Sequence, residues 1–61
     1  MIKPTSVQLQ RLYDQCYRIT NIFLQPIHLV RIDDRTGNLY ILAGVEESIE
    51  VEIDPQGDFV T

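Results

Sequence analysis

The chain has 61 residues, which leaves room for a single small domain, predicted to span residues 1–61. A chain of this size buries only about 60% of the surface that its unfolded form exposes, so we expect marginal stability and reinforcement by self-association. Five basic and nine acidic residues give a net charge of −4. Nucleic acids and anionic membrane surfaces attract basic proteins, so we expect no nucleic-acid partner and no membrane partner.

Cysteine and histidine usage excludes the common stabilising groups. Cys16 is the only cysteine and His28 the only histidine, which precludes an internal disulfide and a closed zinc site, so we expect no metal and no cofactor. The sequence shows neither a secretory signal pattern nor an apolar run near the ~20 residues of a membrane span. We therefore expect a cytoplasmic protein.

An N-terminal helix is predicted over residues 6–23. Its apolar positions recur at steps of three and four residues, which places them on one helical stripe: Leu9, Leu12, Cys16, Ile19 and Phe23. Thr5 or Ser6 can cap its first turn, and Pro26 ends it. The glutamines, Gln8 among them, are expected mainly away from the apolar stripe.

Two strands, predicted over 27–33 and 38–43, form a hairpin around the turn Asp33–Asn38. In that turn Asp and Thr side chains can bond nearby backbone groups, and Gly37 can adopt a positive φ. This turn sets Ile32 opposite Leu39 and Val30 opposite Ile41.

A third strand is predicted over 48–53, where apolar and acidic residues alternate. A Pro-x-Gly turn and a short strand over 58–60 follow. The fold class is therefore α+β, with one N-terminal helix packed on an antiparallel meander of three to four strands.

Both faces of the predicted hairpin are apolar, although one helix can cover only one of them. We expect His28, Val30, Ile32, Leu39 and Ile41 on the covered face. The second face forms a candidate protein-interaction surface made of Ile27, Leu29, Arg31, Tyr40 and Leu42. The leading hypothesis is a small non-enzymatic interaction module that uses this second face, or the sheet edge, to form a homodimer or to bind a small protein partner.

A catalytic reading rests on His28 alone. A general base needs a nucleophile or a substrate proton within hydrogen-bond reach, and the spacing of the sequence predicts no such partner, so we assign no catalytic residue. The alternative is a toxin–antitoxin-like component or a minimal RNase or hydrolase that uses His28 with nearby Arg31, Arg35 or Tyr40.

The segment Gln25–Asp33 and, above all, the stretch Arg35–Gly44 resemble a family of very short proteins of unknown function that is common in cyanobacteria. Members also resemble this chain in starting with one helix and ending with a strand before a Pro-x-Gly turn. The family has no established activity or ligand, so the resemblance implies a fold and no site residues.

Overall fold

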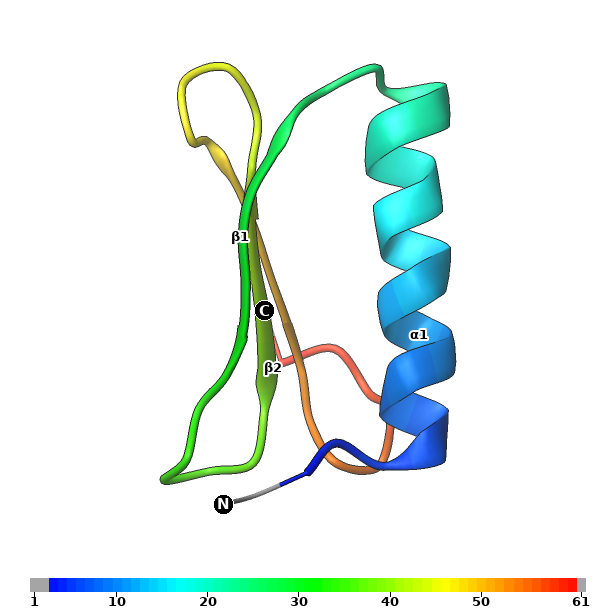
Figure 1. Cartoon of the computed structure of the whole chain (residues 1–61), viewed down its shortest axis with the longest axis vertical. Helices are drawn as coiled ribbons and strands as arrows, with labels where there is room; N and C mark the ends of the chain where they lie inside the picture. Colours follow the sequence, from blue (N-terminus) through cyan, green and yellow to red (C-terminus); the bar gives the residue numbers. More distant parts are fainter. Residues whose placement is uncertain (1–2, 61) are drawn as a thin grey trace.

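A computed structural model describes residues 3–60, so Met1, Ile2 and Thr61 of the predicted domain lie outside the described residues. The chain forms the helix α1 (Ser6–Tyr17), which continues as a π-helical turn η1 (Arg18–Ile22). Three strands follow: β1 (Ile27–Ile32), β2 (Leu39–Ala43) and β3 (Ile49–Ile53). They form one antiparallel sheet in the order β1-β2-β3, and the helix lies along one face of it (Figure 1). This arrangement confirms the predicted α+β class.

The first turn of α1 is fixed by a reciprocal cap. The Thr5 hydroxyl accepts a hydrogen bond from the Gln8 backbone N–H at 3.2 Å, and the Gln8 side-chain oxygen accepts one from the Thr5 N–H at 2.8 Å. Two orphan donors of the helix are thereby satisfied. The Thr5 hydroxyl also donates to the Pro55 carbonyl at 2.7 Å, which ties the helix start to the turn after β3.

The end of the helix is wound more loosely than its start. The Phe23 N–H donates to the Arg18 carbonyl at 2.9 Å, five residues back, which is the π-helical spacing. The chain then leaves the helix at Leu24, whose φ of +55° lies in the left-handed region. Pro26 lies two residues further on, and β1 begins at the next residue, Ile27.

The hairpin has the predicted register. Ile32 pairs with Leu39 and Val30 with Ile41, and the turn closes where the Asp33 N–H donates to the Asn38 carbonyl at 2.8 Å. Gly37 takes a φ of +77°. The register then slips: Leu29 pairs with Leu42, yet Ile27 pairs with Ala43, so His28 is the extra residue of a β-bulge.

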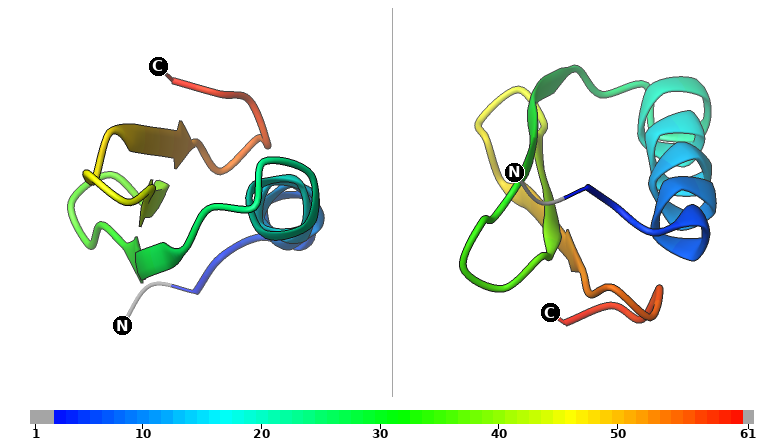
Figure 2. Two further views of the ribbon diagram at one scale, coloured as in Figure 1. Left: turned by 90° about the horizontal axis from the view of Figure 1, so that it is seen from above. Right: turned by 60° about the horizontal axis from the view of Figure 1, so that its bottom comes forward.

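The segment predicted as a fourth strand forms only an isolated bridge, between Ile53 and Phe59. The Val60 N–H adds a bond of 2.9 Å to the Glu52 carbonyl. Because the residues of β3 pair with β2 on their other side, this segment lies along the outer edge of β3 (Figure 2). The edge of β3 is therefore partly covered, whereas β1 pairs only with β2 within residues 3–60.

The core lies between the helix and the strands β2 and β3. Among residues 3–60, five apolar residues are buried: Ile19, Leu39, Ile41, Ala43 and Ile53. Leu12 and Cys16 pack against this group from the helix. Four residues expected in the core or on the covered face are exposed instead: Leu9 at 48%, Phe23 at 60%, Val30 at 42%, and His28. The side of the helix that faces the sheet carries Gln8, Leu12 and Ile19. The buried side is therefore turned towards Gln8 relative to the predicted stripe, which leaves Leu9 and Phe23 in solvent.

The side chain of Gln8 is completely buried. Its amide nitrogen donates to the Gly37 carbonyl at 2.7 Å and to the Ile53 carbonyl at 3.1 Å. One side chain therefore joins the helix start, the β1–β2 turn and the end of β3. The expectation that Gln8 lies away from the buried side of the helix was wrong.

Candidate protein-interaction surface

The face of the sheet that points away from the helix has no helix or strand over it in the described part of the chain (Figure 1). We call it the outer face, and its side chains follow from the strand register: Leu29 beside Leu42 and Glu50, and Arg31 beside Tyr40 and Glu52. Leu29 is 42% exposed, Arg31 is exposed, and Tyr40 and Leu42 are half-buried. Four of the five residues predicted for the interaction surface therefore lie together.

Ile27 is the exception. The bulge at His28 sets Ile27 opposite Ala43, on the side of the sheet that faces the helix, and Ile27 packs half-buried against the core. Side chains alternate strictly along a regular strand, and one inserted residue reverses the face of everything before it. The placement of Ile27 on the outer face is thus corrected.

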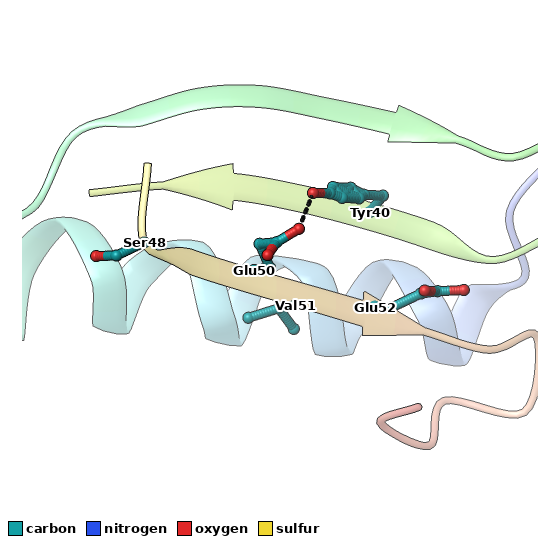
Figure 3. Close-up of a pocket in the computed structure, with 5 residues that line it drawn as sticks. All are labelled: Tyr40, Ser48, Glu50, Val51 and Glu52. Atoms are coloured by element: carbon teal, nitrogen blue, oxygen red, sulfur yellow. Dashed lines mark hydrogen bonds between the residues drawn. The ribbon is translucent and has the colours of Figure 1, made fainter. Parts of the chain in front are cut away.

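A line of polar contacts crosses the outer face between β2 and β3. The Tyr40 hydroxyl donates to a Glu50 carboxylate oxygen at 2.6 Å (Figure 3). The Asn38 amide donates to Glu52 at 2.6 Å. In both pairs the two residues are diagonal neighbours on adjacent strands, and long side chains can span the distance between such positions. The bond to Glu50, with smaller effects of burial and of both carboxylates, raises the pKa of Tyr40 above its ordinary value.

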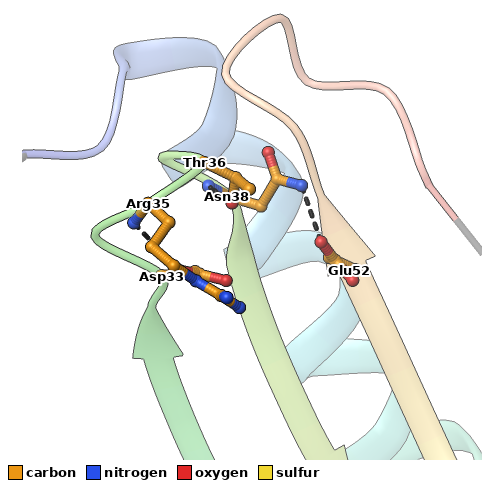
Figure 4. A network of polar contacts seen from close by, with 5 residues as sticks. All are labelled: Asp33, Arg35, Thr36, Asn38 and Glu52. Atoms are coloured by element: carbon orange, nitrogen blue, oxygen red, sulfur yellow. Dashed lines mark hydrogen bonds and ion pairs between the residues drawn. The ribbon is translucent and has the colours of Figure 1, made fainter.

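The β1–β2 turn adds a second polar group at the end of the outer face (Figure 4). The Asp33 carboxylate accepts the Arg35 backbone N–H at 2.9 Å and pairs with the Arg35 guanidinium at 3.5 Å. The backbone bond is the main cause that lowers the pKa of Asp33. The Thr36 hydroxyl accepts the Asn38 N–H at 3.2 Å, so the turn holds itself in place.

Two hollows adjoin these polar groups, and the first also includes Val51, which lies on the helix side of β3 beside Ile41. One, of about 320 Å³, is lined by Tyr40, Ser48, Glu50, Val51 and Glu52. The other, of about 210 Å³, is lined by Arg31, Asp33, Arg35, Asn38, Tyr40 and Glu52. Guanidinium groups lie towards β1 and carboxylates towards β3, with the apolar Leu29–Leu42 pair beyond them. Such a surface can take up an apolar side chain and hydrogen-bond both charged and neutral polar groups around it.

His28 and Cys16 lie outside the outer face. The His28 Nε2 is 2.7 Å from the Gly44 carbonyl; a carbonyl only accepts, so Nε2 carries the hydrogen and the ring is tied to the backbone beside the bulge. Cys16 packs against the core, and burial raises the pKa of its thiol. Within residues 3–60, no three Asp, Glu, His or Cys side chains gather as a metal site would need. None of the described helices is both long and apolar enough to cross a bilayer.

Comparison with known proteins places the chain by its sequence. A family model described as a domain of unknown function (DUF6888) matches residues 3–60. The chain belongs to this family. No curated protein and no solved structure matches the chain.

In this family member, sequence reasoning missed one residue of the candidate surface, Asn38, and one buried residue that supports the adjoining turn, Gln8. Asn38 was treated only as a turn residue, although its position two residues before Tyr40 puts it on the same face and diagonal to Glu52. Gln8 bonds to the Gly37 carbonyl of the turn from the helix side of the sheet. The Thr5-x-x-Gln8 spacing, which is that of a capping box, could have indicated its role at the helix start.

Replacement of Glu50 by glutamine is expected to lower the pKa of Tyr40 towards its ordinary value, because the carboxylate that favours the neutral phenol is removed. In the intact protein the bond stabilises the fold fully below the unfolded tyrosine pKa of about 10 and is lost as the pH rises through the higher folded pKa. The measurement is the ultraviolet absorbance of phenolate against pH, with Tyr13 and Tyr17 replaced by phenylalanine so that Tyr40 alone reports. Glu46→Gln is the control; equal midpoints in the two variants would contradict the assignment.

Proposed function

We propose that the protein is a non-enzymatic interaction module that binds another protein chain, a second copy or a small partner, through the outer face of its sheet. The observation that carries this proposal is the Leu29–Leu42 pair on an uncovered sheet face, next to the polar row of Arg31, Tyr40 and Glu52. An apolar centre with a polar rim is the usual composition of a protein–protein interface.

The size of the domain supports the same proposal. The five apolar residues buried in the described part of the chain are a small core, and several large apolar side chains are left exposed. Small domains commonly gain stability from association, because burial of such side chains against another chain adds to the core. We place this association in the cytoplasm, and we expect further members of the family in cyanobacteria, as the resemblance of the sequence implies.

A lysine at Leu42 tests the outer face. Leu42→Lys puts a charge at the centre of that face on the middle strand, where it would meet the apolar part of a bound chain, and we expect affinity to fall by at least about tenfold. The matched control is Val45→Lys, the same change at a loop residue that is 76% exposed.

Two measurements apply to both variants once circular dichroism shows that each is folded. Sedimentation of the purified protein reports self-association, and quantitative capture by the tagged protein in the organism that encodes it reports partners. Loss with Leu42→Lys but not with Val45→Lys supports the proposal. Unchanged association in both assays for Leu42→Lys would exclude the outer face.

A further inference from the structure

The strand β1 is unusually open for a member of a three-stranded sheet. Val30, on the side of the helix, and Leu29, on the outer face, are each 42% exposed. Val30 lies directly beside Ile41, which is fully buried. The helix therefore shelters β2 and leaves β1 apolar and accessible on both of its faces.

The backbone of β1 has a free side as well. The Asp33 N–H bonds to Asn38 of the hairpin, so by the alternation of an antiparallel ladder Arg31 also points its N–H and C=O at β2. Val30 and Ile32 then point theirs away from the sheet. Within the described residues β1 has no second neighbour, whereas the far edge of β3 is bridged by the segment around Phe59. An exposed edge of this kind is a template for one more strand.

We propose that a second copy of this chain docks along β1, with the two β1 strands antiparallel about a two-fold axis at Val30. The proposal rests on the proposed function in one respect, namely that the protein works by binding protein chains. It goes further by naming the edge, the occupant and the register.

Charge favours a second copy at this edge over any other part of the sheet. The segment from Ile27 to Arg35 carries two arginines and two aspartates, so its formal charge is zero with His28 neutral. The region 46–58 carries six acidic residues and no basic one. Two copies approaching through β3 would set these carboxylates against each other, while two copies approaching through β1 meet through segments that carry no net charge.

The sequence of β1 selects one register. An axis at Val30 sets Val30 beside its own copy and Leu29 beside Arg31 of the other copy, where the aliphatic stem of Arg31 covers the leucine. An axis at Arg31 would put two guanidinium groups directly opposite, which is destabilising. An axis at Ile32 would need residues 34 and 35 as strand, but they form the turn. An axis at Leu29 would set Ile27 opposite Arg31, although the bulge places these two side chains on opposite faces of the sheet, whereas an axis at Val30 meets the bulge only at the end of the pairing.

This dimer would join the two sheets into one, with both helices on the same side. A two-fold axis perpendicular to the sheet does not exchange its two sides, so the outer faces of the two copies would lie on the same side and become continuous. Val30, now 42% exposed on the helix side of β1, would be covered at the joint. The outer face would remain free for a partner protein.

The decisive test exploits the two-fold axis. Val30→Lys and Val30→Glu each place like charges opposite one another, and each is expected to raise the dimer dissociation constant by at least about tenfold in sedimentation experiments. An equimolar mixture of the two variants pairs lysine with glutamate and should restore a dimer, seen as the mixed species by native mass spectrometry. The control Val45→Lys should dimerise as the parent protein does. Restoration on mixing follows only if residue 30 meets residue 30.

Amide exchange of the unmodified protein supplies a readout that does not depend on a variant's folding. The Val30 and Ile32 amides should exchange at least about tenfold more slowly in concentrated than in dilute samples, while the Arg31 amide, already bonded to β2, should change little. A dimer broken by Leu42→Lys and not by the changes at Val30 would overturn the edge proposal and support the proposed function. A monomer at all concentrations would overturn the edge proposal as well, and capture by the tagged protein would then decide the function.

Discussion

Replacement of Gln8 by alanine is expected to lower the free energy of unfolding by about 2–4 kcal/mol, because it removes two buried side-chain hydrogen bonds, to the Gly37 and Ile53 carbonyls, and half of the helix cap. The Gly37 and Ile53 carbonyls both receive their side-chain bond from the Gln8 amide. For a domain of this length the total stability is only about 3–9 kcal/mol, so the loss is a large part of it. Urea unfolding followed by circular dichroism measures the change.

The control for Gln8 lies on the same helix. Gln10→Ala makes the same chemical change at an exposed position and is expected to alter stability by less than about 0.5 kcal/mol. Gln8→Glu gives a second test, because an ionised carboxylate cannot donate to either carbonyl. Its folded pKa should be raised, so the destabilisation should shrink as the pH falls and the carboxyl gains a proton. A Gln8→Ala protein as stable as Gln10→Ala would show that the buried bonds contribute nothing net.

Replacement of Ile41 by alanine is expected to cost about 2–5 kcal/mol, the range for removing a large aliphatic side chain from a packed interior. Ile41 is fully buried at the centre of β2, between Val30 and Val51 and in the same cluster as Ile19. In the described residues one helix and one sheet surround Ile41, so few neighbouring side chains can move to fill the cavity.

The neighbouring Leu42 is the matched control for Ile41. It lies on the same strand but on the outer face, half-buried, so Leu42→Ala removes a side chain of equal size with a smaller loss of buried area. In thermal unfolding, the melting temperature of Ile41→Ala should be well below that of Leu42→Ala. Equal losses would mean that the outer face is packed as tightly as the core, which would contradict an open outer face.

The hairpin could be predicted from local chemistry alone. The Asp33–Asn38 turn fixed the register of Ile32 with Leu39, and the two-residue period then placed Leu29, Tyr40 and Leu42 on one face. What local chemistry could not supply was the bulge. It depends on contacts across the sheet, where the Gly44 N–H bonds to Pro26 and His28 bonds to the Gly44 carbonyl, and these moved Ile27 to the core side.

The position of the helix over the sheet could not be predicted either. Apolar periodicity gave a stripe centred between Leu9 and Cys16, but the buried amide bonds of Gln8 rotate the helix towards β3. A polar residue can enter a small core when its own polar atoms are all hydrogen-bonded there, as those of Gln8 are. The exposure of Val30, and with it the open edge of β1, is a direct result of that rotation.

The bonds of Gln8 also bear on the order in which the chain folds. They connect residues 29 and 45 positions apart, whereas the hairpins of the meander are local. The Gln8 amide can bond to both carbonyls only after the β1–β2 and β2–β3 hairpins have formed, so we expect these two bonds to form late in folding. Its loss should therefore quicken unfolding and leave the rate of folding nearly unchanged.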